Sequence, residues 1–280
     1  MSTIISSIPK ITASGLKRKA HDSIRRFREK TKPYIEGHRG CNKEEDENTL
    51  AAFLKAIEYG CDSIEFDVWL TKDKIPVVIH GSKEGGIEET TNGEGKVSEF
   101  TYEELSKYST TLNNHRIPSV EEVINLCKDK VFMNIEIKEK ESALECIEII
   151  IDRIIHHNIH DQVAISTFEQ GVWHDLKKIC EFHSIEIGYL YDNHGSKDVE
   201  FFYDESKFYS SMNVWQGNVT AEFVEIAHKN NIAVHCWFCL DDKEDEDVIH
   251  HLIKCDVDII CCNYPGNSLK IRDSLYGSDC

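Results

Sequence analysis

Two carboxylates stand two positions apart in the run CDSIEFDVWLTKDKIPVVIH, residues 61–80. Side chains alternate faces along a strand, so Glu65 and Asp67 would point the same way. Converging carboxylates repel each other unless a cation or a proton lies between them, and Mg²⁺ or Ca²⁺ suits oxygen ligands. His80 ends the next apolar run. The run predicts a cation site with a proton-transfer group beside it, although an exposed strand of alternating charge would look the same.

These residues need a framework that brings strand ends together. Strand-like and helix-like patterns alternate from Ser119 onward, and a helix with apolar positions at helical spacing begins at Leu50. Residues 81–117 interrupt the rhythm as a long insertion after the second strand. Alternating strands and helices imply parallel βαβ units, and eight of them predict a closed (β/α)₈ TIM barrel. The predicted strands begin near residues 34, 63, 131, 162, 185, 209, 232 and 257.

A barrel of this kind carries its active site at the C-terminal ends of its strands. Glu136 and Lys138 share one face of the strand at 131–137. Glu65, Asp67 and Glu136 can therefore supply one cation site. Arg39, which follows the first strand, and Lys138 are left to bind an anion, and Arg can do so bidentately. A surface salt bridge between Glu136 and Lys138 is the plain alternative.

Two histidines also lie at predicted strand ends. His38 follows the first strand and His80 follows the run after the second, so the two can act as general acid and general base. Either one alone is more often a structural, hydrogen-bonded group. Together with the cation site and the two basic residues, they describe a site for phosphate-ester hydrolysis.

The charge of the chain argues against a nucleic-acid-binding surface. The chain has 280 residues, 40% of them apolar, and a formal net charge of −18. Residues 1–32 form a basic tail with nine Lys and Arg against Asp22 and Glu29, a net charge of +7. We expect a solvated tail followed by a catalytic domain over 33–280. Peripheral contact with an anionic membrane, or mitochondrial targeting, is the alternative for this tail.

The cysteines and the apolar runs indicate in which cellular compartment the protein would be found. Eleven cysteines, an odd number, are scattered through apolar stretches, which is typical of reduced core thiols. Cys236 and Cys239 form a CxxC, but in a strand this spacing puts them on opposite faces, so we expect no redox or zinc site there. No apolar run reaches the roughly 18 residues that span a bilayer, and the first residues lack a secretory apolar region. We expect a cytoplasmic protein.

Several short motifs follow one another in a fixed order. They are GHRG at 37–40, ENT at 47–49, GCDSIEFDV at 60–68, TKD at 71–73, PVVIH at 76–80, TNG at 91–93, EIK at 136–138, Trp237 and YP at 264–265. In this order they resemble the glycerophosphodiester phosphodiesterase family over about residues 34–270. The resemblance implies a TIM barrel, a divalent cation, and cleavage of glycerophosphodiesters to glycerol phosphate and an alcohol.

By motif position, the resemblance assigns the three carboxylates to the cation, the two histidines to acid–base catalysis, and Arg39 and Lys138 to the phosphate. It adds Glu47 as support for His38 or for the metal, and Trp237 as part of the wall that contacts the leaving alcohol. The chain departs from the family pattern after the second histidine, after the C-terminal Trp and before the Tyr-Pro pair. The residues at these three positions are Gly81, Leu240 and Asn263.

Two other functions remain open. A lysophospholipase D would use the same residues on lysophospholipids, with an apolar groove at the barrel mouth and the basic tail on a membrane. A catalytically inactive barrel retained for binding is the alternative from another class, and the intact His, Glu, Asp and Lys set argues against it.

Overall fold

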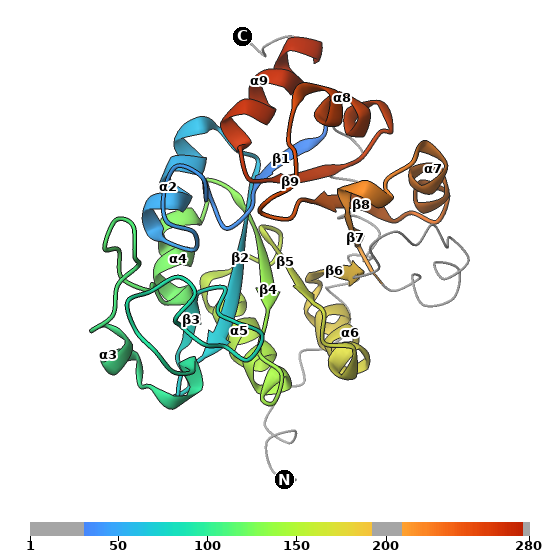
Figure 1. Ribbon diagram of the computed structural model, residues 1–280. Coiled ribbons are helices and arrows are strands. Elements are labelled where there is room, and N and C mark those ends of the chain that lie inside the picture. Colours follow the sequence, from blue (N-terminus) through green and yellow to red (C-terminus); the bar gives the residue numbers. More distant parts are fainter. Residues whose placement is uncertain (1–30, 192–208, 277–280) are drawn as a thin grey trace.

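Among the residues that the computed structural model describes, 31–191 and 209–276, eight parallel strands close into a barrel (Figure 1). The first strand pairs with both the second and the last, which closes the ring. The parallel strands are β1 (Tyr34–Gly37), β2 (Ser63–Leu70), β4 (Phe132–Ile137), β5 (Val163–Thr167), β6 (Glu186–Tyr191), β7 (Ser211–Trp215), β8 (Ala233–Trp237) and β9 (Ile259–Cys262). The predicted (β/α)₈ barrel is confirmed.

Helices follow the strands and cover the outside of the barrel (Figure 1). Thr49 begins the first of them, because its hydroxyl accepts a hydrogen bond from the Ala52 N–H, and Gly60 ends it in the left-handed conformation. The larger helices are α2 (Leu50–Tyr59), α4 (Val120–Cys127), α5 (Ala143–His157), α6 (Trp173–His183), α7 (Ala221–Lys229), α8 (Glu246–Lys254) and α9 (Pro265–Tyr276).

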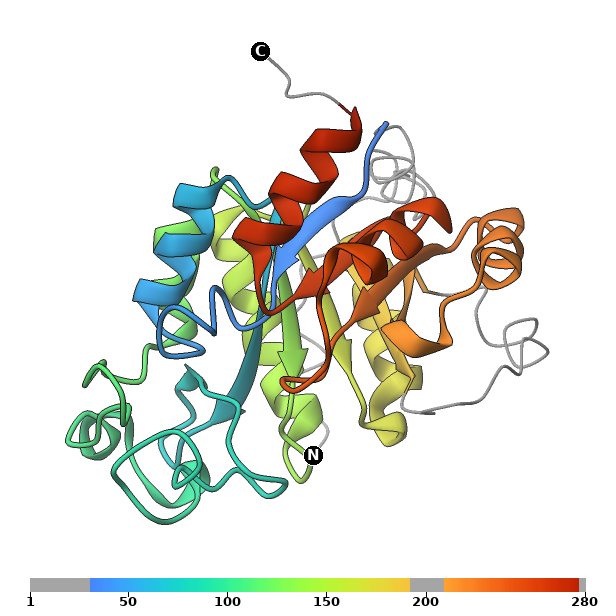
Figure 2. The ribbon, with the colours of Figure 1, turned by 45° about the horizontal axis from the view of Figure 1, so that its top comes forward.

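The last helix ties the end of the domain to its beginning. Figure 2 shows α9 alongside β1, and the two elements are in contact. Arg272 on α9 is buried and donates a hydrogen bond to the carbonyl oxygen of Pro33 and another to the carboxylate of Asp62. The barrel is therefore held closed by side chains as well as by strand pairing.

The expected insertion follows a short antiparallel strand, β3 (Pro76–Val78), that pairs with β2. It contains a 3-10 turn, Val97–Glu99, and a short α-helix, α3 (Tyr102–Leu105), and it packs around a small core of its own. Buried members of this core are Trp69, Val77, Ile79, Ile87, Val97, Leu105 and Ile117.

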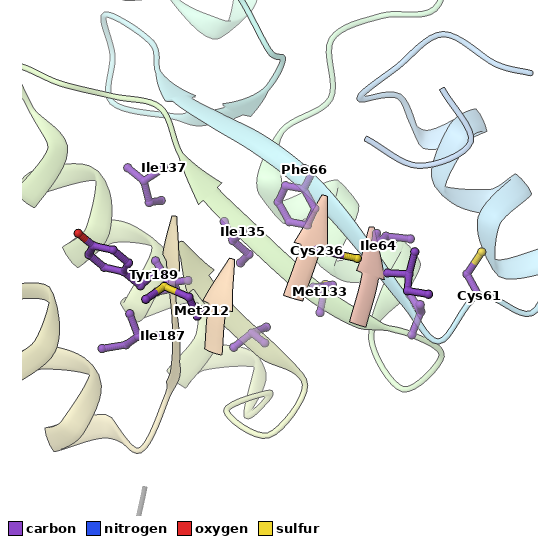
Figure 3. Close-up of a cluster of buried hydrophobic side chains, with 14 of the residues drawn as sticks. Cys61, Ile64, Phe66, Met133, Ile135, Ile137, Ile187, Tyr189, Met212 and Cys236 are labelled. Carbon is purple, nitrogen blue, oxygen red and sulfur yellow. The ribbon is translucent and has the colours of Figure 1, made fainter. Parts of the chain in front are cut away.

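Alternation along β2 separates the core from the chemistry. Ile64 and Phe66 belong to the large hydrophobic core (Figure 3). Because neighbouring side chains in a strand point to opposite faces, Glu65 and Asp67 face the inside of the barrel. The same alternation on β4 places Ile135 in the core and Glu136 inside. Burying the apolar face of each strand thus fixes the direction of its carboxylates.

Ten cysteines lie in the described part of the chain. Nine of them are buried. Cys236 is buried on β8 and Cys239 is half-buried beyond its end. In the same part of the chain, none of the helices has the length and apolar character needed to cross a membrane. The predicted basic tail lies outside the described residues apart from positions 31 and 32.

Candidate active site

Three carboxylates converge at the C-terminal ends of β2 and β4. Asp67 and Glu136 are direct neighbours in the parallel register, and Glu65 lies one step below Asp67 on the same face. All three side chains are buried, and their ligand atoms lie within 4.8 Å of one another. The structure therefore brings together the three residues that the sequence assigned to a cation.

The electrostatics of this cluster are uneven. Burial and the charges of Asp67 and Glu136 raise the pKa of Glu65 well above its usual value, and burial also raises the pKa of Glu136. Burial opposes ionisation of Asp67 too, but the nearby Arg39 and other cationic groups hold its pKa below the usual range. Glu65 Oε1 is buried and receives no hydrogen bond from any described residue. Oxygen ligands with surplus negative charge and an unsatisfied oxygen fit a hard divalent cation.

Two cations border the carboxylates. Lys138 Nζ lies 2.9 Å from Glu136 Oε1 and 3.7 Å from Asp67 Oδ1. Arg39 Nη1 donates to both oxygens of Glu47, at 2.9 and 3.0 Å, and Arg39 Nε lies 3.3 Å from Asp67 Oδ2. Glu47 is thus paired with Arg39, and the family resemblance implied support for His38 or for the metal. The plain alternative of an exposed salt bridge at Lys138 is wrong, because Glu136 is buried.

The turn that carries His38 and Arg39 is shaped by glycines. A Cβ on Gly37 would lie 2.8 Å from the carbonyl oxygen of Gly40, and Gly40 has a φ of +80° with Ala52 of α2 packed against it. Arg39 itself has a φ of +53°, a conformation that costs energy for a residue with a Cβ. The backbone of this turn also serves the site, since the Arg39 N–H donates to Glu65 Oε2 at 2.9 Å.

The two histidines have different partners. His38 Nδ1 lies 2.9 Å from Asn263 Oδ1, and its Nε2 lies 4.0 Å from Glu65 Oε2. His80 Nδ1 lies 3.6 Å from a carboxylate oxygen of Glu89. Burial, with Arg39 nearby, lowers the pKa of His38 to about 3 and that of His80 to about 4. In the absence of bound ions, both imidazoles are therefore neutral at pH 7.

Two side chains that contribute to the site were not predicted from the sequence. The side chain of Asn48 donates to Asp67 Oδ2 at 2.8 Å and accepts from the Asp67 N–H. Phe168 packs edge-on against Trp237, with ring centroids 6.4 Å apart, and Lys138 Nζ lies 5.9 Å from its centroid. Trp237 thus stands close to the anion-binding side of the site. Asn48 lies within the ENT motif at 47–49 but was given no role at the site, and no sequence motif marks Phe168.

A second group of metal-ligating residue types lies inside the barrel, made of Glu36, His235 and Cys261. Glu36 Oε1 lies 2.8 Å from His235 Nε2, and the other oxygen accepts a hydrogen bond from the Ser63 hydroxyl. Burial opposes ionisation of Glu36, but His235 holds its pKa below the usual value, while burial raises the pKa of the Cys261 thiol well above its own. This carboxylate already has its partners and the thiol keeps its proton, so the group is a buried polar pair rather than a second metal site.

Comparison with known proteins places the chain among enzymes. A family model described as "Glycerophosphoryl diester phosphodiesterase family" matches residues 38–267. A glycerophosphodiester phosphodiesterase of Caldanaerobacter subterraneus is 37% identical over 254 residues, covering 86% of this chain and 98% of that protein. One from Bacillus altitudinis is 30% identical over 253 residues with the same coverage, 86% and 98%.

Solved structures agree in fold. The glycerophosphodiester phosphodiesterase of Thermotoga maritima superposes with a TM-score of 0.67 at 26% identity, over 86% of this chain and 98% of that one. An Oleispira antarctica phosphodiesterase, solved in complex with the product sn-glycerol-3-phosphate, gives a TM-score of 0.73 at 22% identity, over 86% and 97%.

Proposed function

The chain belongs to the glycerophosphoryl diester phosphodiesterase family, and on that premise we propose that it hydrolyses glycerophosphodiesters with a divalent cation held by Glu65, Asp67 and Glu136. One observation carries the proposal. Three buried carboxylates converge, and an oxygen of Glu65 receives no hydrogen bond from any described residue. A cation supplies the positive charge that such an arrangement lacks.

The side chains around the carboxylates account for the remaining steps. When bound, the cation would act as a Lewis acid on the phosphate. Arg39 and Lys138 stabilise the charge that builds on the phosphoryl oxygens. One of the two imidazoles, His38 or His80, takes the proton from the attacking hydroxyl of the glycerol or of water. The other, which holds a proton once the negative charge of the phosphodiester lies beside it, donates that proton to the leaving alkoxide. Attack by water gives glycerol phosphate and a neutral alcohol directly. Attack by the glycerol hydroxyl releases the alcohol and leaves a cyclic glycerol phosphate, which a water molecule then opens to glycerol phosphate with the two imidazoles in exchanged roles.

The leaving alcohol would contact the aromatic pair Trp237 and Phe168. Two relatives at 37% and 30% identity are named glycerophosphodiester phosphodiesterases, and a soluble glycerophosphodiester is therefore the substrate that we propose first. Lysophospholipase D is the second candidate, because an edge-on aromatic pair at the barrel mouth also offers apolar surface to an acyl chain. In that case the basic tail of residues 1–32 would bring the enzyme to an anionic membrane.

The test is release of glycerol phosphate from glycerophosphocholine, measured with EDTA and after adding back Mg²⁺ or Ca²⁺. Release that stops in EDTA and returns with one ion supports the proposal and identifies the ion. Full turnover in EDTA contradicts the cation site. Choline release from lysophosphatidylcholine without turnover of the soluble diester supports the second candidate, and no turnover of either substrate indicates a binding barrel.

A further inference from the structure

A buried carboxylate that the mechanism does not use is connected to His38. Glu244 lies in the loop after β8 and is buried. It accepts hydrogen bonds from the backbone N–H groups of Asn263 and Tyr264, at 2.8 and 3.0 Å, and from the side-chain amide nitrogen of Asn263. Asn263 itself is 1% exposed and follows β9. One carboxylate therefore fixes both the backbone and the side chain of the residue that contacts His38.

The hydrogen bonds determine which way the Asn263 amide points. Its nitrogen donates to Glu244 and to the carbonyl oxygen of Cys239, at 2.9 Å in the second case. Both partners can only accept, so they must face the NH₂ group. The amide oxygen is then the atom 2.9 Å from His38 Nδ1.

A second set of contacts leads to the same orientation. Asn42 Nδ2 lies 2.8 Å from the carbonyl oxygen of His38, and a carbonyl can only accept, so this atom is the NH₂ nitrogen. The same nitrogen lies 2.8 Å from Asn263 Oδ1. A donor therefore faces Asn263 Oδ1, which independently makes that atom an oxygen.

An oxygen acceptor beside Nδ1 requires a proton on Nδ1. The lone pair of a neutral His38 is then on Nε2, the nitrogen that lies 4.0 Å from Glu65 Oε2. We propose that Glu244 and Asn263 are positioning residues that hold His38 in the Nδ1–H tautomer, so that Nε2 is the base of the reaction and His80 the acid. This assignment rests on the proposed function, because it gives an order to the two histidines named there.

The proton stays on Nδ1 throughout. When Nε2 takes the proton of the attacking hydroxyl, His38 becomes a cation and its Nδ1–H bond to the Asn263 oxygen strengthens. The Asn263 amide donates and accepts hydrogen bonds but does not ionise, so no proton is transferred to it or from it. The negative charge of Glu244 therefore acts on His38 by polarising this amide. Stabilisation of the imidazolium in this way favours the transition state and should affect kcat more than KM.

A charge exchange between the two positions tests the arrangement. Asn263→Asp alone places two carboxylates in direct contact in a buried place. Glu244→Gln alone removes the charge and puts a competing donor beside the Asn263 NH₂ group, so that only Asn42 and the Cys239 carbonyl still favour the original orientation of the amide. In the double variant, the new amide at position 244 would donate to the new carboxylate at position 263, which would still accept from His38 Nδ1. The Cys239 carbonyl loses its donor in Asn263→Asp and in the double variant alike, so the comparison between these two variants isolates the effect of position 244. We expect each single variant to lower kcat about 10–100-fold with little change in KM, and the double variant to recover about tenfold relative to Asn263→Asp.

A spectroscopic measurement follows the tautomer without relying on turnover. In ¹⁵N-histidine-labelled protein, the His38 signal is identified by its loss in His38→Ala, and its nitrogen shifts report which nitrogen carries the proton. We expect the Nδ1–H tautomer in the wild type and in the double variant, and a mixture in Glu244→Gln. A wild-type protein in the Nε2–H tautomer overturns the proposal. Inactive wild-type protein that shows the Nδ1–H tautomer would instead count against the proposed function alone.

Asp242 provides the matched control in the same loop. Its carboxylate accepts hydrogen bonds from the Cys239 N–H at 2.7 Å and from Trp215 Nε1 at 2.8 Å, so it anchors the loop through other partners. Asp242→Asn should lower Tm but leave the tautomer unchanged and kcat within about twofold. An equal loss of kcat in Asp242→Asn and Glu244→Gln, or a folded double variant that does not recover, would show that Glu244 only holds the loop in place.

Discussion

Removing a charge from Glu65 or from Asp67 should change the stability of the metal-free protein in opposite directions, although either change should abolish turnover. Glu65→Gln and Asp67→Asn keep the shape of the side chain, and a Gln oxygen can still accept the hydrogen bond from the Arg39 N–H. The two carboxylates differ in their surroundings. The charge of Glu65 is opposed by its neighbours, as its raised pKa reflects, whereas the charge of Asp67 is stabilised by Arg39 and Lys138.

The distances between the carboxylates set the size of the expected change in stability. Two unit charges 4.8 Å apart, the upper limit for the ligand atoms here, repel by about 3.5 kcal/mol at an effective dielectric constant of about 20. Glu65 faces two such neighbours, and Arg39 offsets part of the repulsion. We expect Glu65→Gln to stabilise the metal-free protein by about 1–3 kcal/mol, or about 2–4 °C in Tm for each kcal/mol. Asp67→Asn removes a partner of two buried cations and should cost about 3–5 kcal/mol.

The pH dependence of the two effects also differs. A carboxyl whose pKa is raised by folding destabilises the protein once the pH passes its unfolded pKa, which for Glu65 is near 4.5. The gain from Glu65→Gln should therefore vanish below that pH and grow above it. Asp67 has a lowered pKa and contributes stability above its unfolded value of 3.8, which is lost as the pH falls through the folded value. The loss from Asp67→Asn should shrink in acid.

Thermal unfolding of the metal-free protein between pH 2 and 8, with EDTA present, measures these differences. Glu36→Gln is the matched control, since it makes the same chemical change at another buried carboxyl inside the barrel whose pKa is lowered by His235 despite burial. It should destabilise the protein. Mg²⁺ or Ca²⁺ should then raise Tm in the wild type and much less in Glu65→Gln. The reasoning is refuted if Glu65→Gln loses stability in EDTA as Glu36→Gln does, or if it keeps near-normal turnover at low metal concentration.

Three further results are expected. His38→Ala and His80→Ala should each lower kcat by about 10²–10⁴-fold. A substrate with a p-nitrophenolate leaving group needs no general acid, so in a rate assay it should rescue only His80→Ala. Rescue of His38→Ala instead would make His38 the acid and His80 the base. Deleting residues 1–32 should leave turnover of a soluble diester nearly unchanged, and a protein that unfolds on deletion would show that the tail belongs to the domain. Hydrogen bonds from Arg116 are the main cause that lowers the pKa of Glu122 to about 2. Glu122→Gln should therefore lower the free energy of unfolding, measured in urea at pH 7, by about 1 kcal/mol after solvent screening. This difference from the wild type should disappear as the pH falls from 4.5 towards 2. An unchanged difference at pH 3 would contradict the assignment.

The barrel and the three converging carboxylates could be predicted because both follow from periodicity. A period of two along β2 fixes the common face of Glu65 and Asp67, and the burial of Phe66 between them in the hydrophobic core confirms which face is which. Glu136 joins them because parallel strands place their C-terminal ends together. Such arguments need only local sequence and the rule for parallel barrels.

Contacts between loops could not be predicted in this way. Residues 241–247 contain six acidic side chains and one lysine, and of these only Glu244 is buried. Nothing in that run marks the buried one, because its burial depends on the path of the loop toward Asn263 rather than on any periodicity. The motif order likewise could not show that Glu47 binds Arg39, since both residues lie in irregular segments around a residue with positive φ.

The charges of the site suggest why its basic residues are held by acids before substrate arrives. Four carboxylates, at Glu65, Asp67, Glu136 and Glu47, surround two cations, which leaves an excess of two negative charges. Such a site repels a phosphodiester. A divalent ion matches the excess and weakens the hold of the carboxylates on Arg39 and Lys138, whose side chains can then turn part of their hydrogen-bonding capacity to the phosphate. We therefore expect metal and phosphodiester to bind cooperatively, each raising the affinity for the other by the same factor.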